Sequence, residues 1–180
     1  MNVEQQTRQT SSDPGKEFPF APSDYVLHLL TVISLYRDST LDSRLRPLGL
    51  NVGRYRAMAV LNRFGACTMT EVSSFTGVDR TTLTRVADQL VASGWAERMS
   101  EAKDRRQVLL CLTGPGREIL DEAIKVIIEV NASLLENVAE EDQRLAARTL
   151  MRMVDNVAPN KRSRDGIIHF SREGLDQDKA

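Results

Sequence analysis

The sequence DRTTLTRVADQLVASGWAER, residues 79–98, predicts an amphipathic helix that runs into a β-strand. Asp79 is of a residue type that caps helix N-termini, and Gly94 is of the type that ends helices. One face of the helix is apolar and carries Leu83, Val86, Ala87 and Leu90. At about 100° per residue, the opposite face carries Thr81, Thr84, Arg85 and Asp88. Such a face suits the DNA major groove, because Thr and Arg side chains reach base edges and phosphates there.

A hairpin is predicted directly after this helix. Residues 95–99 and 108–112 are short apolar runs, and the charged segment 100–107 between them is too long for a two-residue turn. An amphipathic helix followed by a hairpin also occurs in proteins that bind no nucleic acid. The preceding residues are what favour the DNA-reading interpretation over the purely structural one.

A second helix is predicted immediately before the first. Thr68 and Glu71 have the spacing of a capping box, in which each side chain satisfies a free backbone amide of the other residue. Val72 and Phe75 are the expected buried positions, and Gly77 ends the helix. The next helix begins within two residues, so the pair has the tight glycine-containing connection of a helix-turn-helix.

Two further helices are predicted upstream. Ser23 can cap a long helix that ends before Pro47, and Asn51 can cap the next one, which Gly65 closes. A very short extended piece follows at residues 66–67. The long helix is too apolar to stand alone, with Val26, Leu29, Leu30, Ile33, Tyr36, Leu41 and Leu45 at helical spacing. In the helix capped by Asn51, the inward positions are Tyr55, Met58 and Leu61, and Leu50 and Tyr55 form a hydrophobic staple.

Two helices are predicted downstream of the hairpin. Thr113 caps the first, which tolerates Pro115 in its opening turn and extends over some 25 residues, about 37 Å. Its apolar stripe is wider than one contact within the chain needs, and comprises Ile119, Leu120, Ala123, Ile124, Ile127, Ile128, Leu134, Leu135 and Val138. The last helix starts at the acidic residues 140–142 and ends at Pro159. Its apolar face carries Leu145, Leu150, Met153, Val154 and Val157.

The composition is that of an ordinary globular domain. The 180 residues are 41% hydrophobic and 27% charged, with a net charge of −1. No run of about 18 apolar residues predicts a membrane span, and the N-terminus has no apolar signal core, so we expect a cytoplasmic protein without a membrane partner. Two cysteines fit a reducing compartment and exclude a disulfide framework.

The charge is unevenly distributed along the chain. Five basic and no acidic residues lie between positions 44 and 64, whereas eight acidic residues and one lysine lie between 118 and 142. Positive charge is therefore expected near the helix-turn-helix, and negative charge far along the chain. Between residues 68 and 106 the charges balance at six basic and six acidic, which predicts modest, strongly salt-dependent DNA affinity.

The order of these elements resembles the multiple antibiotic resistance regulator (MarR) family of bacterial transcription factors. The resemblance rests on LRPLGL at 45–50, DRTTLTR at 79–85, LVASGWAER at 90–98, DRR at 104–106 and LCLTGPGR at 110–117. It implies a mainly α fold with a winged helix-turn-helix domain at 49–113, which contains a three-stranded wing sheet. The implied helical dimerisation region is 23–48 with 114–158, flanked by a mobile arm at 1–22 and a tail at 159–180.

The resemblance also implies a homodimer whose two winged helices straddle a palindromic operator. It further implies a repressor that a small aromatic or anionic ligand releases from DNA. The implied DNA-binding residues are Arg80, Thr81, Thr82, Thr84, Arg85, Lys103, Arg105 and Arg106. In the wing an arginine enters the minor groove, with Arg106 as first choice, and Asp104 braces it. Asp79, Asp88 and Asp104 oppose phosphate unless they cap or pair, and Arg85 has the i,i+3 spacing to pair with Asp88.

The implied effector site lies between the dimerisation helices and the winged helix, lined by His28, Ser34, Tyr36, Arg37, Tyr55 and Met58. The alternative is that the two tyrosines and the methionine are core residues and the arginine is a solvated surface charge. Redox sensing is a rival switch, because Cys67 and Cys111 fall on strands that pair in a winged helix. Both cysteines have apolar neighbours, and buried thiols are usually inert.

No catalytic set or cofactor site is predicted. His28 and His169 have no Cys/His cluster around them, and there is no glycine-rich phosphate loop or nucleophile elbow. The competing function from another class is a dimeric interaction or adaptor protein whose winged helix does not bind DNA. A dimerisation part of an enzyme is a third reading, disfavoured at this length.

Overall fold

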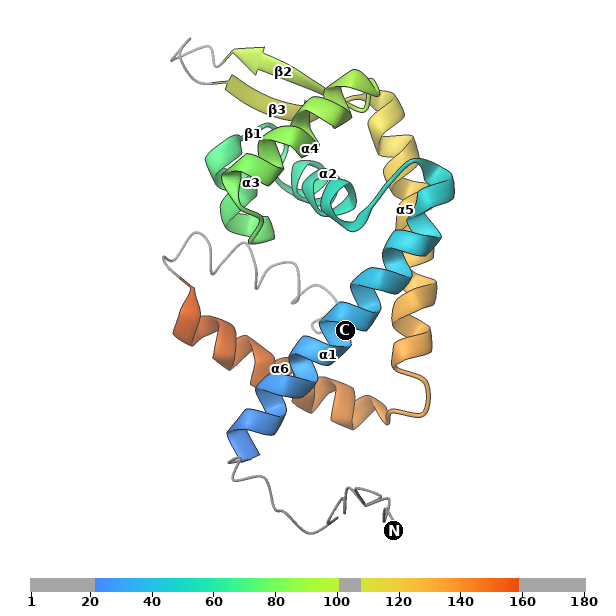
Figure 1. Ribbon diagram of the computed structural model, residues 1–180, viewed down its shortest axis with the longest axis vertical. Coiled ribbons are helices and arrows are strands. Elements are labelled where there is room, and N and C mark those ends of the chain that lie inside the picture. The colour runs from blue at the N-terminus through green and yellow to red at the C-terminus, as the bar shows by residue number, and fades with distance from the viewer. Residues whose placement is uncertain (1–21, 101–107, 159–180) are drawn as a thin grey trace, which may run out of the picture. The chain divides into compact units, whose positions relative to one another are not determined.

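The computed structural model describes residues 22–100 and 108–158. The predicted arm up to residue 21, the segment 101–107 and the predicted tail from residue 159 lie outside the described residues. The described chain is mainly α-helical, with one three-stranded sheet (Figure 1). Its elements are α1 (Pro22–Leu45), the 3-10 helix η1 (Arg46–Leu48), α2 (Val52–Phe64), β1 (Cys67–Thr68), α3 (Met69–Thr76), α4 (Arg80–Ala92), β2 (Ala96–Ser100), β3 (Val108–Leu112), α5 (Gly114–Leu134) and α6 (Glu140–Val157).

The chain divides into two compact units, residues 1–35 and 36–180, and the division falls inside α1. The described part of the first unit is the N-terminal portion of α1. This helix begins at Pro22, so the prediction that Ser23 precedes the helix as its cap is wrong. Proline suits the first turn of a helix, because its missing N–H would have no partner there.

The other predicted caps are confirmed, and each is a side-chain oxygen that accepts a backbone N–H. Asn51 accepts from Arg54 at 2.8 Å and starts α2. Thr68 and Glu71 form the capping box of α3. Thr113 accepts from Gly116 at 3.1 Å and starts α5. These contacts fix where the helices begin, because the first amides of a helix have no partner within it.

A winged helix is assembled in the second unit from α2, α3, α4 and the sheet. The helix α4 packs against α2, α3 and β2, and Figure 1 shows α3 and α4 beside α2. The sheet is antiparallel with the order β1-β3-β2. The short strand β1 aligns Cys67 with Leu110, and the hairpin aligns Ala96 with Leu112 at one end and Ser100 with Val108 at the other. The predicted hairpin and three-stranded wing sheet are confirmed.

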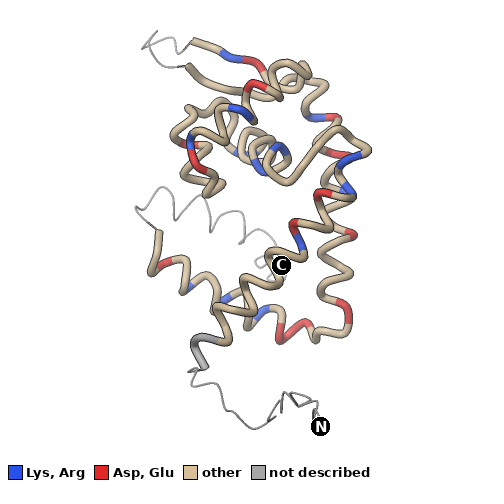
Figure 2. The backbone as a smooth tube through the Cα atoms, in the orientation of Figure 1, with Lys and Arg blue, Asp and Glu red and all other residues tan. Residues whose placement is uncertain are grey.

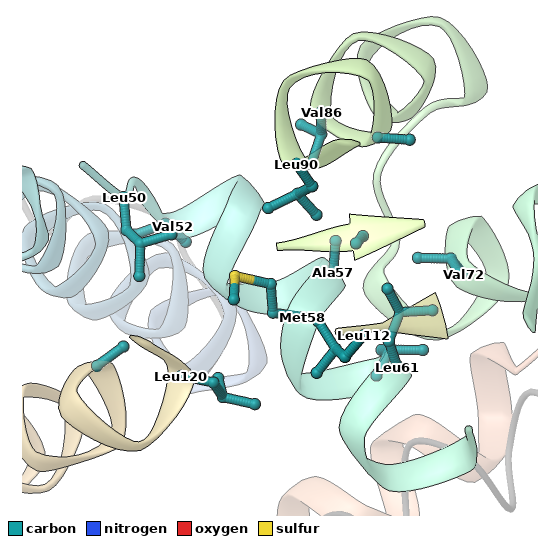
Figure 3. Close-up of a cluster of buried hydrophobic side chains, with 14 of the residues drawn as sticks. Leu50, Val52, Ala57, Met58, Leu61, Val72, Val86, Leu90, Leu112 and Leu120 are labelled. Atoms are coloured by element: carbon teal, nitrogen blue, oxygen red, sulfur yellow. The ribbon is translucent and has the colours of Figure 1, made fainter. Parts of the chain in front are cut away.

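The core of this unit lies between the helices and the sheet. Figure 3 shows Val86 and Leu90 of α4 approaching the α2 residues Met58 and Leu61, together with Leu112 of β3 and Leu120 of α5. All are buried, as the helical spacing of their apolar residues predicts. At ~25 cal/mol per Å² of apolar surface removed from water, this cluster is the main stabilising contribution to the winged helix.

The helix α5 packs against α2 and η1 but is shorter than predicted. It ends at Leu134, and the following turn contains Asn137 with a backbone φ of 61°. That left-handed conformation cannot continue a right-handed helix, and asparagine tolerates it better than most residues. Figure 2 shows acidic residues along α5 and at the start of α6, in line with the predicted concentration of negative charge.

The last helix, α6, is amphipathic but has no buried residue in the single chain. Its first turn carries Glu140, Glu141 and Asp142, where negative charge interacts favourably with the helix dipole. Among the described helices, none combines the length and apolar character needed to cross a membrane.

Candidate nucleic-acid interface

The helix α4 presents a polar face to solvent. Asp79 caps the helix by accepting a hydrogen bond from the amide of Thr82 at 2.9 Å. The predicted apolar face is buried and the predicted polar face is exposed. The exposed side chains are Arg80, Thr81, Thr82, Thr84, Arg85 and Asp88. Within this set, the Thr84 hydroxyl donates to the backbone oxygen of Arg80 at 2.8 Å, which leaves its oxygen free to accept.

The two arginines on this face are available to a ligand. Neither Arg80 nor Arg85 has a side-chain hydrogen bond or ion pair with any residue in the ranges 22–100 and 108–158. A guanidinium group offers five N–H donors in a planar fork, which matches a phosphate or the acceptor edge of guanine. The first turn and a half of α4 therefore carries positive charge that the described part of the protein does not neutralise.

The acidic residues near α4 are engaged by the protein. Asp79 caps the helix, and its hydrogen bonds from Thr82 hold the pKa of its carboxyl group below the usual value. Asp88 forms an ion pair with Arg98 of β2, with 2.5 Å between Oδ1 and Nη2. The predicted pairing of Asp88 with Arg85 is therefore wrong. The hairpin brings Arg98 to Asp88, a long-range contact that spacing along one helix does not reveal.

Two arginines of the basic stretch at residues 44–64 pair with carboxylates, and a third donates to neutral acceptors. Arg44 pairs with Glu129 of α5, and Arg56 pairs with Asp38 of α1 at 2.8 Å. Arg54 donates from Nε to the Gln89 side chain at 3.1 Å and from Nη1 to the backbone oxygen of Gly49. These arginines tie elements together, whereas the two arginines of α4 have no side-chain partner in the described chain.

The predicted wing residues Lys103, Asp104, Arg105 and Arg106 lie outside the described residues. The flanking strands are described: β2 ends at Ser100, and β3 begins at Val108. The structure therefore fixes where the segment leaves and rejoins the sheet.

The predicted effector residues are distributed over the two units, and each unit is considered by itself. His28 and Ser34 are exposed on the α1 portion of the first unit. In the second unit Met58 is fully buried in the core, whereas the Tyr36 side chain is 71% exposed. The Arg37 Nε donates to the Asn131 side chain at 3.0 Å.

Tyr55 is half-buried and lies within electrostatic reach of two arginines. Burial raises the pKa of its hydroxyl group, and Arg37 and Arg56 partly offset that rise. The second unit therefore brings Arg37 and Tyr55 close together, whereas Met58 packs as a core residue.

The two cysteines lie on opposite faces of the sheet. Cys67 aligns with Leu110, and both side chains are buried on the face toward the helices. Cys111 follows Leu110 in the same strand, so its side chain points to the other face. There it contacts Glu97 and Met99. Adjacent strands do carry the two thiols, as predicted, but the faces are wrong for a disulfide between them.

Comparison with known proteins identifies this winged helix. A sequence model of the MarR family matches residues 48–107, which span α2, the helix-turn-helix and β2. The multiple antibiotic resistance protein MarR of Salmonella typhimurium is 30% identical over 94 residues, which are 52% of this chain and 65% of that protein. Over its winged helix, this chain is similar to proteins of the MarR family. The match spans a little less than two thirds of that relative's length.

Solved structures of MarR-family proteins are similar in fold to most of this chain. A MarR-family transcriptional regulator from Silicibacter pomeroyi has a TM-score of 0.69 at 22% identity, covering 77% of this chain and 94% of the other. The apo form of MarR from Escherichia coli has a TM-score of 0.60 at 25% identity, covering 78% and 99%. The mainly helical fold with a winged helix, predicted from the sequence, is confirmed.

Two polar residues that the sequence did not single out contact α4. Arg98 on β2 and Arg54 on α2 hold the adjacent residues Asp88 and Gln89. Strand alternation gave a signal for Arg98, since it lies on the same face of β2 as the buried Ala96. No comparable signal marks Arg54, because its partner is 35 residues away in the sequence.

Proposed function

We propose that this protein is a homodimeric transcriptional repressor that inserts α4 into the major groove of a palindromic operator. The observation that carries the proposal is the exposed face of α4, where Arg80 and Arg85 have no side-chain partner in the described chain. Thr81, Thr82 and Thr84 lie on the same surface and supply short hydroxyl groups. Arginine recognises guanine and phosphate, and threonine contacts phosphates and the thymine methyl group.

Known relatives support DNA binding. A cysteine-to-serine mutant of Escherichia coli MarR was solved in complex with operator DNA, with a TM-score of 0.65 and 24% identity to this chain. The transcriptional repressor MprA of Escherichia coli is 33% identical over 102 residues. By analogy we assign the segment 101–107 to the wing, with Lys103, Arg105 and Arg106 contacting DNA and Asp104 bracing them.

Exposed apolar surface supports a homodimer. In the first unit, α1 exposes Tyr25, Val26, Leu27, Leu29, Ile33 and Leu35. In the second unit, α5 and α6 expose Ile128, Leu134, Leu145, Leu150 and Val157. Exposed apolar side chains at this density on neighbouring helical turns are typical of an interface. A second copy of the chain covers them, with residues 25–45 and 117–157 forming the contact.

A small aromatic or anionic effector is proposed to release the operator. BpsR of Bordetella bronchiseptica is regulated by 6-hydroxynicotinic acid, and CouR of Rhodococcus jostii was solved with p-coumaroyl-CoA. In this chain Arg37 and the half-buried Tyr55 supply a cation and an aromatic ring in the second unit. Within the second unit we assign Tyr36 to the effector site with these two residues, whereas Met58 is fully buried in the core.

The proposal is tested by titrating the protein against DNA from upstream of its own gene at two salt concentrations. We expect sequence-specific binding that weakens with salt, because phosphate contacts release counterions. Arg85→Ala should weaken binding by roughly tenfold or more, the loss of one bidentate base contact. Arg46→Ala removes the same charge from the exposed surface of η1, outside α4 and outside the proposed dimer contact, and is the matched control. Absence of sequence preference at low salt contradicts the proposal and favours the adaptor reading.

A further inference from the structure

Two neighbouring side chains near the C-terminal end of α4 hold arginines from two different elements. Asp88 Oδ1 accepts from Arg98 Nη2 of β2 at 2.5 Å. Gln89 Oε1 accepts from Arg54 Nε of α2 at 3.1 Å. Successive residues on a helix point about 100° apart, so the two contacts restrain α4 from two directions. Together they fix the rotation of the helix about its own axis.

The register of the sheet places Arg98 for this contact. Arg98 aligns with Leu110, which in turn aligns with the buried Cys67. These three residues form one row across the inner face of the sheet, and Arg98 is at the outer end of that row. Its stem lies on the side of α4, and its guanidinium group reaches Asp88 at the edge of the core.

Arg54 is anchored from a second direction. Its Nη1 donates to the backbone oxygen of Gly49, at the turn between η1 and α2, while its Nε holds Gln89. The contact with Gln89 is partly buried. The guanidinium group therefore connects α4 to the turn that precedes α2.

The Asp88–Arg98 pair is too exposed to be explained by stability. Its two side chains are 57% and 44% exposed, and exposed ion pairs contribute little to folding. Asp88 shares the exposed face of α4 with Arg85, so an unpaired carboxylate there would repel DNA phosphates. Pairing with Arg98 neutralises that charge and also links the wing hairpin to α4.

We propose that Arg98 and Arg54 are positioning residues, which set the orientation of α4 relative to β2 and α2 without contacting DNA themselves. This inference rests on the proposed DNA-binding function. It assigns a role to two arginines that otherwise count as general DNA-binding charge. Because each guanidinium group is held by a partner within the protein, the loss of either arginine alters affinity through geometry.

The test compares operator affinity and its salt dependence in Asp88→Asn/Arg98→Gln with those of the wild type. This double variant keeps the net charge, since it removes one negative and one positive group. We expect affinity to fall by about fivefold, the upper range for an exposed pair, with an unchanged slope of log affinity against log salt. If Arg98 instead contacts a phosphate, the slope falls by about 0.9, and the proposal is overturned.

Arg54→Gln provides the second arm and predicts the same pattern, weaker binding with an unchanged slope. The matched control for Arg54→Gln is Arg46→Gln, which removes the same charge from the exposed surface of η1, outside α4 and outside the proposed dimer contact. Its operator affinity should equal that of the wild type. If the Asp88 and Arg98 double variant also binds like the wild type, the inference fails while the proposed function stands.

A measurement without DNA separates the two ideas if the wild type shows no specific binding. Backbone amide hydrogen exchange in β2 and in the last turn of α4 should be faster in the Asp88→Asn/Arg98→Gln variant, because the link between these elements is lost. Unchanged exchange in both segments overturns the positioning role. Faster exchange in a protein that binds no operator supports the positioning role of Arg98 and contradicts only the proposed DNA-binding function.

Discussion

Gly116 lets the first turn of α5 pack closely against the backbone of the winged helix. A Cβ atom at this position would lie 1.9 Å from the backbone oxygen of Trp95. The first turn of α5 therefore rests on the backbone that follows α4. Thr113 strengthens the junction, because its amide donates to Trp95 and its hydroxyl donates to the backbone oxygen of Gly94 at 2.6 Å. The start of α5 is thereby linked to the turn that follows α4.

We predict that Gly116→Ala destabilises the fold by about 1–3 kcal/mol, because backbone atoms must shift to admit a methyl group. Gly114→Ala is the matched control, since a Cβ atom there meets no atom within 4 Å. Urea unfolding of the two variants measures the difference. Equal stabilities would contradict the close approach of α5 to Trp95.

Cys111 should be a poorly reactive thiol. Burial raises its pKa, and the nearby carboxylate of Glu97 raises it further. Glu97→Gln removes that charge and lowers the pKa, so the rate of alkylation at pH 8 should increase because more thiolate is present. Glu122→Gln serves as the control at a distant carboxylate. An unchanged rate in Glu97→Gln would show that Glu97 does not act on the thiol.

At the residue scale, local chemistry was predictable and long-range partners were not. The caps at Asn51, Thr68, Asp79 and Thr113 bind amides within three residues, so each can be predicted from the local sequence. The partner of Asp88 lies ten residues away across a hairpin, and the pairing inferred from helix spacing was wrong.

At the scale of the element, α4 is stabilised by a cap that depends on pH. Hydrogen bonds from Thr82 lower the pKa of Asp79 from its usual 3.8. A group with a lowered folded-state pKa stabilises the fold above its unfolded-state pKa, and this contribution is lost as the pH falls through the folded-state value.

We therefore predict that the wild type is more stable than Asp79→Asn at pH 7, and that the difference shrinks as the pH falls below about 4. Asparagine caps helices without titrating, so it isolates the effect of the charge. Thermal unfolding from pH 7 to pH 3 measures both proteins. A difference that does not vary with pH would exclude a charged cap.

Helix limits were predictable where a residue forbids continuation and less so elsewhere. Gly65 and Gly77 end α2 and α3 as expected, each with a positive φ. The apolar pattern predicts an α5 that extends beyond its actual end at Leu134, because the pattern continues through Leu135 and Val138. Those two side chains remain exposed in the single chain, so their helical spacing does not reflect a buried helix face.

At the scale of the whole molecule, the exposed apolar residues of α5 predict a dimer at micromolar concentration. Ile128 is 61% exposed, so Ile128→Asp should cost the folded single chain little. In a dimer the same change buries a charge, and light scattering should report a monomer. Circular dichroism confirms that the variant is folded. A monomeric wild type would contradict the dimer, and a dimeric variant would exclude this face of α5 as the contact.

We propose that the dimer holds two copies of α4 about one DNA turn apart, roughly 34 Å, so that an effector need only alter this spacing. Footprinting upstream of the protein's own gene first locates the two half-sites. The decisive measurement is then the affinity for this operator against that for the same DNA with about 5 base pairs inserted between the half-sites. We expect a large loss of affinity, since half a turn places the second half-site on the opposite side of the duplex. Equal affinity for the two DNAs would contradict it.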